Sequence, residues 1–227
     1  MAHSGGPRRA ALFDVDGTLV DTNYLHAVTW WEAFRQAGHT VPMPDIHRAV
    51  GMGGDRLIVH LLGPDRDRSQ DGAVSAAHTA LYAAYFPKLA PLPGAADLLR
   101  ALAERGWRVV LASSAGGAEL AAMRAAVDAD DVIAGATSGD DVDATKPAPD
   151  LVRAAVRLSG LPASQALFVG DTVWDMRACG AAGVRCLGLL SGGIPRADLE
   201  AAGAAAVYEG LADLLAQLRR GTAMTGA

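Results

Sequence analysis

Two aspartates that follow a short apolar run are the first residues of this chain whose types and spacing could do chemistry. Residues 10–13 are apolar and predict a buried strand, and Asp14 and Asp16 come directly after it with one residue between them. Side chains alternate along an extended backbone, so both carboxylates lie on one side of it. Carboxylates this close repel each other and favour a shared proton or a bound cation. Taken alone, the stretch equally fits a solvated acidic turn.

Further polar residues lie at the ends of later predicted strands or near the starts of predicted helices. These residues are Ser113, Ser114, Lys146, Asp171 and Asp175. Because the carboxyl ends of parallel strands meet at one edge of a sheet, we expect these side chains to converge with the two aspartates. Each of them alone also fits a helix cap, a solvated charge or a first-turn acid. Those separate explanations do not account for acids gathering at one edge.

The residue types in this cluster predict a magnesium-dependent transfer of a phosphoryl group. Carboxylate oxygens with no histidine or cysteine beside them favour a hard cation such as Mg²⁺. A serine, a lysine and the N–H groups at a helix start would hold the remaining phosphate oxygens. In such a site one carboxylate can act as the nucleophile, and a second carboxylate two residues further on can transfer the proton.

The elements that must position these residues predict an α/β fold with a Rossmann-like parallel sheet. From about residue 92 onward, apolar runs typical of strands alternate with amphipathic segments typical of helices. This alternation predicts a sheet with helices on both faces. The pattern closes with an edge strand at 205–208, a helix at 211–220 and a loose tail at 221–227.

Residues 21–88 interrupt this alternation with helical patterns and no convincing strand. The inserted segment follows the carboxyl end of the first strand, which is the edge where the site is expected. We therefore expect it to lie over the site as a lid. The predicted domains are therefore an α/β core formed by residues 8–20 and 89–227, and a small all-helical cap formed by residues 21–88.

Composition and charge exclude several classes of protein. The 227 residues are 51% hydrophobic with a net charge of −5, which fits a globular protein without a basic surface for nucleic acid. The two cysteines are too few for a disulfide framework or a zinc site. The N-terminus lacks the apolar segment of a signal peptide, and no run reaches the ~18 apolar residues of a membrane span. We therefore expect a cytoplasmic protein, monomeric or homodimeric, that binds neither nucleic acid nor membrane.

Together these motifs resemble the four motifs of the haloacid dehalogenase (HAD) superfamily. The matching motifs are Asp14-x-Asp16-Gly17-Thr18-Leu19, Ser113, Lys146-Pro147 and Gly170-Asp171-x-x-x-Asp175. Their order and spacing match from residue 10 to about residue 190. The helical insertion resembles the cap of the subfamily that includes phosphoglycolate phosphatase and β-phosphoglucomutase.

The resemblance implies a role for each motif residue. Asp14 would be the nucleophile, and Asp16 would be the general acid and base. The residues implied to bind the phosphoryl group are Thr18, Ser113, Ser114 and Lys146. The residues implied to hold Mg²⁺ are Asp14, Asp16 through its backbone carbonyl, Asp171 and Asp175.

The resemblance also favours phosphate esters over other substrates of the superfamily. Metal-independent dehalogenases lack an aspartate at the position of Asp16. Phosphonatases of this group carry a cap lysine, whereas residues 21–86 contain none. The implied function is a Mg²⁺-dependent phosphatase that hydrolyses a small phosphorylated metabolite through an aspartyl-phosphate.

Two other functions remain compatible with the motifs. A sugar phosphomutase of the β-phosphoglucomutase type would share the core motifs, and analysis of the products formed from hexose 1-phosphates would distinguish it. A phospho-accepting signalling or binding module would use the same acids and Mg²⁺. Such modules carry no insertion of this size.

The cap is expected to select the substrate. The stretch 51–56 is glycine-rich, which permits a close approach of substrate to backbone. Gly53 and Arg56, together with His26, are the candidate specificity residues, and Arg56 would meet a second anionic group on the substrate. The same residues also fit a helix-breaking turn with a solvated arginine, and a structural histidine.

Overall fold

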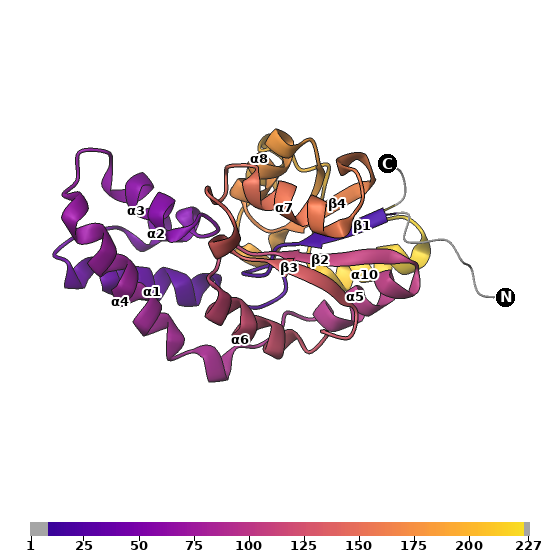
Figure 1. Cartoon of the computed structure of the whole chain (residues 1–227), viewed down its shortest axis with the longest axis horizontal. Helices are drawn as coiled ribbons and strands as arrows, with labels where there is room; N and C mark the ends of the chain where they lie inside the picture. The colour runs from indigo at the N-terminus through magenta and orange to yellow at the C-terminus, as the bar shows by residue number, and fades with distance from the viewer. Residues whose placement is uncertain (1–8, 225–227) are drawn as a thin grey trace.

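One parallel six-stranded sheet forms the centre of the molecule (Figure 1). The computed structural model describes residues 9–224. The strands are β1 (Arg9–Phe13), β2 (Trp107–Ala112), β3 (Ile133–Thr137), β4 (Ala166–Gly170), β5 (Arg185–Leu189) and β6 (Ala206–Tyr208). Their order across the sheet is β3-β2-β1-β4-β5-β6, and every neighbouring pair is parallel. Strand β1 therefore lies between β2 and β4, and the residues that follow these three strands are neighbours.

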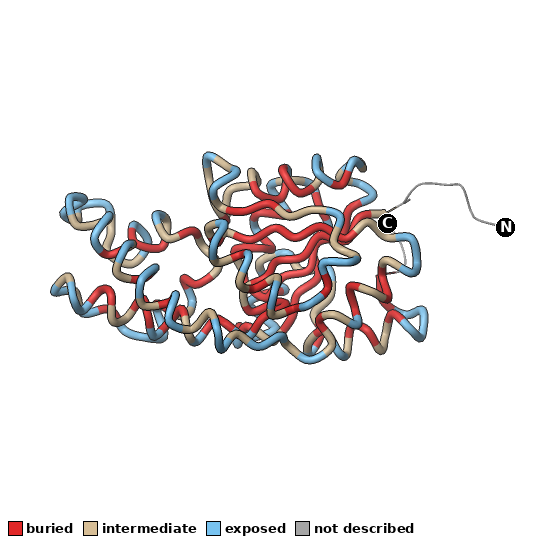
Figure 2. Tube along the Cα trace, turned by 60° about the horizontal axis from the view of Figure 1, so that its bottom comes forward, coloured by how far each residue is buried: buried red, intermediate tan, exposed pale blue. Residues whose placement is uncertain are grey.

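Alternating side chains of the strands build two apolar cores, one on each face of the sheet. The strands at the centre of the molecule are mostly buried, as their red colour shows (Figure 2). On β1, Ala11 and Phe13 belong to one core, and Ala10 and Leu12 belong to the other. The first core is covered by α5 (Ala95–Glu104), α6 (Gly117–Val127) and α10 (Leu211–Arg220). The second is covered by α7 (Asp150–Ser159), α8 (Val173–Ala182) and α9 (Arg196–Ala201). The predicted Rossmann-like fold is confirmed.

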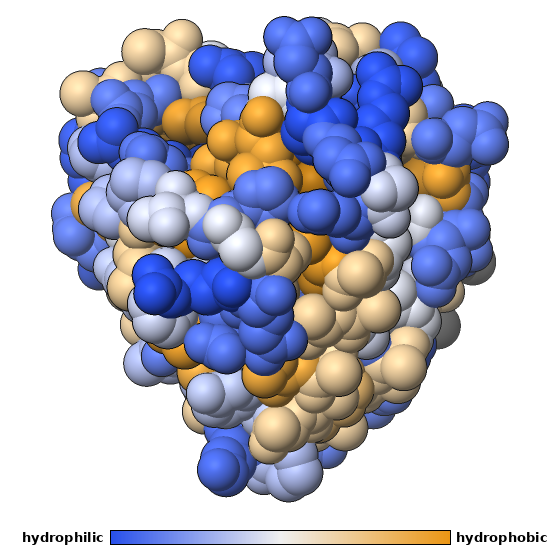
Figure 3. All heavy atoms as spheres, turned by 90° about the vertical axis from the view of Figure 1, so that its left-hand side faces the viewer, coloured by the Kyte–Doolittle hydropathy of each residue, from blue (hydrophilic) through white to orange (hydrophobic). Residues whose placement is uncertain are grey.

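A helical unit lies at one end of the sheet, on the left in Figure 1. Its helices are α1 (Asn23–Gln36), α2 (Met43–Ala49), α3 (Gly54–Leu62) and α4 (Asp71–Ala83), with 3-10 turns at Arg68–Gln70 and Phe86–Lys88. Trp30, Phe34 and Ile46 are buried in an apolar core that belongs to this unit alone. Its outer end carries hydrophilic and apolar areas side by side, and the broadest strongly apolar area lies near the top of Figure 3. We refer to residues 21–88, the predicted cap domain, as the cap.

Three local predictions differ from the structure. The apolar pattern of the sequence predicts a helix from Leu57 to Leu62, whereas α3 already begins at Gly54. Helix α9 was not predicted, because a segment of six residues with a single buried side chain gives no periodic signal. Ala223 and Met224 pack against the first core, so the predicted loose tail is wrong for these residues.

Residues 1–8 and 225–227 lie outside the part of the chain that the structure describes. The prediction that the N-terminus carries no signal peptide falls almost entirely on residues 1–8. The last three residues of the predicted loose tail are residues 225–227. Within the described part, none of the helices has the length and apolar character that crossing a bilayer requires.

Candidate active site

Three buried carboxylates converge at the carboxyl ends of β1 and β4. Asp14 follows β1, Asp171 follows β4, and Asp175 lies in the first turn of α8. One carboxylate oxygen from each lies within 4.8 Å of the other two. The backbone N–H of Asp14 donates to the carbonyl of Val169 at 3.0 Å, which joins the two strand ends. The structure thus brings together three of the four acids that the sequence analysis assigned to a metal.

A buried lysine compensates part of this negative charge. Lys146 Nζ lies 2.5 Å from Asp14 Oδ1 and 2.7 Å from Asp175 Oδ1. Burial alone would lower the pKa of Lys146, but the two carboxylates outweigh this effect and raise it above its ordinary value. Lys146 therefore stays cationic at neutral pH.

The remaining charge of the site fits a divalent cation. Three carboxylates face one ammonium group, so negative charge is in excess. Burial, reinforced by the neighbouring acids and opposed by Lys146, holds the pKa of Asp14 well above its usual range. Burial and the charge of Asp175 raise the pKa of Asp171 to about 7. Carboxylates with such shifts lack sufficient counter-charge, and an all-oxygen donor set suits Mg²⁺.

Hydrogen bonds fix the directions of two of these acids. Thr172 and Asp175 form a capping box at the start of α8, in which the Thr172 N–H and hydroxyl donate to Asp175 Oδ2 at 3.1 and 2.6 Å. The other oxygen, Oδ1, faces Lys146. Asn23 Nδ2, in the first turn of α1, donates to Asp171 Oδ2 at 2.7 Å. The metal-site acids are thus oriented by a helix start and by a residue of the cap.

Two of the residues predicted to bind phosphate have other partners in the structure. Thr18 Oγ1 donates to Asp171 Oδ1 at 2.7 Å, and Ser113 Oγ donates to Asp16 Oδ2 at 3.3 Å. Both side chains are fully buried, and a buried hydroxyl needs a partner, which the nearby carboxylates supply. The two residues therefore hold carboxylates in this arrangement. Ser114, the next residue, is the one that faces the cavity described below.

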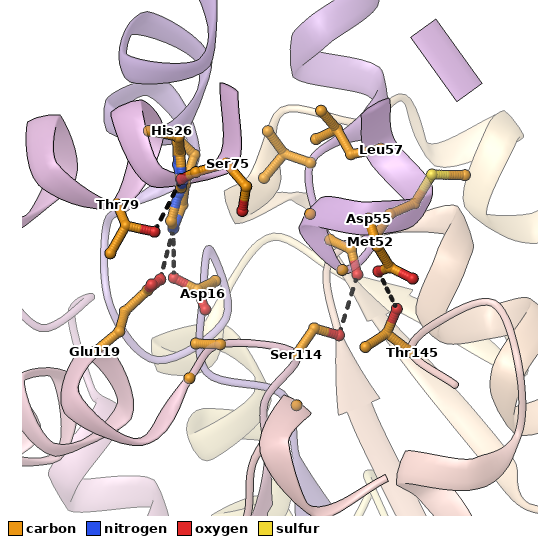
Figure 4. Close-up of a pocket in the computed structure, with 18 of the residues that line it drawn as sticks. Asp16, His26, Met52, Asp55, Leu57, Ser75, Thr79, Ser114, Glu119 and Thr145 are labelled. Carbon is orange, nitrogen blue, oxygen red and sulfur yellow. Dashed lines mark hydrogen bonds and ion pairs between the residues drawn. The ribbon is translucent and has the colours of Figure 1, made fainter. Parts of the chain in front are cut away.

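The side chain of Asp16 belongs to a second cluster, which joins the core to the cap (Figure 4). His26 Nε2, on α1, lies 3.0 Å from Asp16 Oδ1 and 3.3 Å from Glu119 Oε1, on α6. Burial disfavours the charged imidazole, but hydrogen bonds to both carboxylates raise the pKa of His26 to about 10. The contact with His26 also outweighs the effect of burial on Asp16 and lowers its pKa. His26 is thus a cation shared by two carboxylates.

A second histidine continues this cluster into the cap. His26 Nδ1 lies 3.2 Å from His78 Nε2, and the His78 ring stacks on Trp30 with 3.9 Å between centroids. Burial and the charge of His26 lower the pKa of His78 to about 2, so it is neutral. Cationic His26 donates from both ring nitrogens, so His78 Nε2 accepts and its proton is on Nδ1. The sequence analysis missed Glu119 and His78, because each lies on a predicted helix without a local motif.

A cavity of about 340 Å³ lies between the cap and the core (Figure 4). The carboxylate residues Asp14 and Asp16 line it. From the core it is lined by Asp14, Asp16, Ser114, Ala115, Gly116, Glu119, Gly139, Asp140 and Thr145. From the cap it is lined by His26, Trp30, residues 50–55, Leu57, Ser75, His78 and Thr79. Two of the predicted specificity residues, His26 and Gly53, therefore face the cavity.

The third predicted specificity residue does not face the cavity. Leu57 and Ile58 point into the apolar core of the cap and fix the rotation of α3 about its axis. With this rotation α3 presents Asp55 to the cavity, and Arg56 is not among the described lining residues. The contact of Arg56 with a substrate anion therefore stays a prediction, which this arrangement of the cap does not support.

Hydrogen bonds away from the cavity also hold the cap against the core. Trp174 Nε1 donates to the carbonyl of Arg48 at 2.9 Å. His47 Nε2 lies 2.9 Å from the carbonyl of Gly192. Trp174 lies on α8, and Gly192 lies in the 3-10 turn that follows β5. Both contacts therefore join α2 of the cap to the carboxyl edge of the sheet. The structure therefore shows the cap in contact with the core.

Known proteins are similar to this chain in sequence and in fold. The family model of the haloacid dehalogenase-like hydrolases matches residues 8–183. The chain belongs to this family.

A phosphoglycolate phosphatase from Rhodospirillum rubrum is 31% identical, over 91% of this chain and 89% of its own length. A solved hydrolase from Pseudomonas syringae has a TM-score of 0.88 at 34% identity and covers 93% of this chain and 98% of its own. CbbY from Rhodobacter sphaeroides, solved as a variant with xylulose 1,5-bisphosphate, has a TM-score of 0.73 at 26% identity, over 91% and 96% of the two chains. These haloacid dehalogenase-like relatives span almost the same length as this chain.

Proposed function

We propose that this chain is a divalent-metal-dependent phosphatase that hydrolyses a small phosphate monoester through a phosphorylated Asp14. The observation that carries the proposal is the position of Asp14. Of the three clustered acids Asp14, Asp171 and Asp175, Asp14 alone lines the described cavity. Membership of a hydrolase family and similarity to a phosphatase support this class of reaction.

The three clustered acids and the backbone carbonyl of Asp16 would hold the metal ion. When bound, a Mg²⁺ ion would neutralise charge on the acids and on the phosphate oxygens. Lys146 contributes a fixed positive charge on the same side, through its contact with Asp14 Oδ1. Both charges lower the repulsion between an anionic nucleophile and an anionic phosphate ester.

Asp14 performs the first bond-forming step in this mechanism. One of its carboxylate oxygens attacks phosphorus, the bond from phosphorus to the alcohol oxygen breaks, and an aspartyl-phosphate forms. Water then attacks the same phosphorus, which releases inorganic phosphate and restores the Asp14 carboxylate. Burial of Asp14 at the end of β1 keeps the carboxylate in a single place for both steps.

Asp16 transfers the proton in both steps. It protonates the departing alcohol oxygen in the first step and takes a proton from the attacking water in the second. In the substrate-free arrangement His26 keeps Asp16 ionised, which is the form that accepts a proton. A phosphate dianion beside Asp16 raises its proton affinity by repulsion between like charges, which favours the acid form for the first step.

Replacement of the nucleophile tests this proposal. We expect D14N to lose hydrolysis of p-nitrophenyl phosphate with Mg²⁺ by about 10³-fold or more, because an amide is a poor nucleophile at phosphorus. D97N provides a matched control, because Asp97 is exposed in the first turn of α5 and does not line the cavity. Substantial activity in D14N would contradict the assignment of the nucleophile.

A further inference from the structure

The cavity beside Asp14 carries an unusual charge distribution for a site that binds phosphate esters. Five lining residues have carboxylates, namely Asp14, Asp16, Asp55, Glu119 and Asp140. None of the lining residues that the structure describes is a lysine or an arginine. At the reacting end, the metal ion and Lys146 would offset the acids. The organic part of a bound substrate would face the other lining residues, which include Asp55.

The cations closest to this cavity are not available to a second anion. The proton on His26 Nε2 is already shared between Asp16 and Glu119, at 3.0 and 3.3 Å. The Lys146 side chain is buried behind Asp14 and bound to two carboxylates. Arg56, at the end of the glycine-rich cap stretch, is not among the described lining residues. A carboxylate or second phosphate in the cavity would face acids without a counter-charge.

The same walls do offer partners for hydroxyl groups. Ser75 and Thr79, on α4, point into the cavity from the cap, and Thr145 and Asp55 approach it from the opposite wall (Figure 4). Thr145 Oγ1 lies 3.5 Å from Asp55 Oδ1, at the limit of a hydrogen bond. A hydroxyl can donate to a carboxylate and accept from a serine or threonine, so this set matches an alcohol. Its volume of about 340 Å³ leaves room for more than a phosphate group.

We propose that the substrate of this site is a monophosphate whose organic part is uncharged and hydroxylated, such as a sugar or polyol phosphate, and carries no second anionic group. This inference rests on the proposed phosphatase function and specifies its substrate class. It separates this chain from two of the relatives described above, one named a phosphoglycolate phosphatase and one solved as a variant in complex with xylulose 1,5-bisphosphate. Phosphoglycolate carries a carboxylate, and xylulose 1,5-bisphosphate carries a second phosphate.

Matched substrate pairs test the inference directly. The first pair is 2-hydroxyethyl phosphate and phosphoglycolate. The former carries a hydroxymethyl group at the position where the latter carries a carboxylate. The second pair is xylulose 5-phosphate and xylulose 1,5-bisphosphate. We expect kcat/KM to be at least about tenfold higher for the uncharged member of each pair, because uncompensated like charges weaken binding. Equal or better hydrolysis of the anionic members would overturn the inference, and so would a clear preference for 2-aminoethyl phosphate over 2-hydroxyethyl phosphate.

Charge variants of the cap should move this preference in a predictable direction. D55N removes one lining carboxylate with little change in shape, and S75R adds a cation on α4, so each should raise the relative kcat/KM for phosphoglycolate several-fold. A76R is the matched control for S75R, because Ala76 is exposed on the same helix and does not line the cavity. An equal effect of A76R and S75R would contradict a role for the cavity wall.

The outcomes separate this inference from the proposed function. A protein that hydrolyses p-nitrophenyl phosphate through Asp14 and prefers phosphoglycolate retains the proposed function and refutes the inference. A protein that hydrolyses neither the aryl phosphate nor any member of the pairs refutes the proposed function and, with it, the inference.

Discussion

At the scale of single residues, Lys146 sets the charge balance of the buried acids. Its ammonium group contacts Asp14 and Asp175, and it has no exposed surface. Such a buried pair is weak evidence for stability in itself, since desolvation of both charges offsets their attraction. Removal of one partner is different, because it leaves the other charges buried and uncompensated.

We therefore expect K146M to lower the free energy of unfolding by about 3–5 kcal/mol in the absence of metal. Urea denaturation with and without Mg²⁺ would measure the loss, and Mg²⁺ should restore part of it by pairing with the acids. K88M is the matched control, because Lys88 is exposed at the end of the cap and should tolerate the change within about 0.5 kcal/mol. A loss below about 1 kcal/mol in K146M would show that the charge balance described here is wrong.

The motif residues were predictable because each follows an apolar run, and the end of such a run can be located in the sequence. Asp14 and Asp171 lie where the strands were expected to end. The choice between Asp55 and Arg56 was not predictable. Adjacent residues of a helix point about 100° apart, so the face that α3 presents depends on how Leu57 and Ile58 pack in the cap.

At the scale of elements, the start of α8 determines the direction of Asp175. In its capping box, Thr172 and Asp175 satisfy each other's backbone N–H groups, so one short segment both begins the helix and aims a carboxylate oxygen at Lys146. The structural and the chemical role of Asp175 are therefore linked.

Loss of this cap should weaken both the helix and the metal site. We expect T172V, which keeps the shape of the side chain, to cost about 1–2 kcal/mol of stability in thermal or urea unfolding. Calorimetric titration should also show weaker Mg²⁺ binding, because Asp175 is no longer held in place. T40V serves as the control, since Thr40 is exposed in a cap loop. Unchanged Mg²⁺ affinity in a destabilised T172V would disprove the link between the capping box and the metal site.

The elements themselves were largely predictable from periodicity, and their contacts were not. The central strands β1 and β4 are almost entirely apolar, as expected for strands that are buried on both faces. Glu119 and His78 acquire their roles only when α6 and α4 approach His26. No sequence pattern within α4 or α6 predicts that these helices come close to His26.

At the scale of the whole molecule, the cap and the core enclose the cavity between them. Contacts that join them include the pair His26–Glu119, which lines the cavity, and the hydrogen bonds of Trp174 and His47, which lie away from it. The cap also keeps an apolar core of its own, separate from the two cores of the sheet. We infer that the cap can move away from the core by breaking a small number of polar contacts.

The double variant W174F/H47A should favour an open arrangement. It removes two hydrogen bonds between cap and core, which together contribute about 1–3 kcal/mol to closure. We expect a larger radius of gyration in small-angle scattering, and a KM raised roughly fivefold or more with a smaller change in kcat. W107F is the control, because Trp107 lies on β2 in the core. An unchanged KM and radius would indicate that other contacts hold the cap.

Asp14 is expected to become phosphorylated during turnover, and a rapid-quench experiment tests this most directly. The protein is mixed with excess Mg²⁺ and p-nitrophenyl phosphate, quenched in acid within milliseconds, digested and analysed by mass spectrometry. We predict one added phosphoryl group on the peptide that contains Asp14, more of it in D16N because loss of the base slows hydrolysis of the intermediate, and none in D14N. Product release without phosphorylation of Asp14, or phosphorylation of a different residue, would contradict the account.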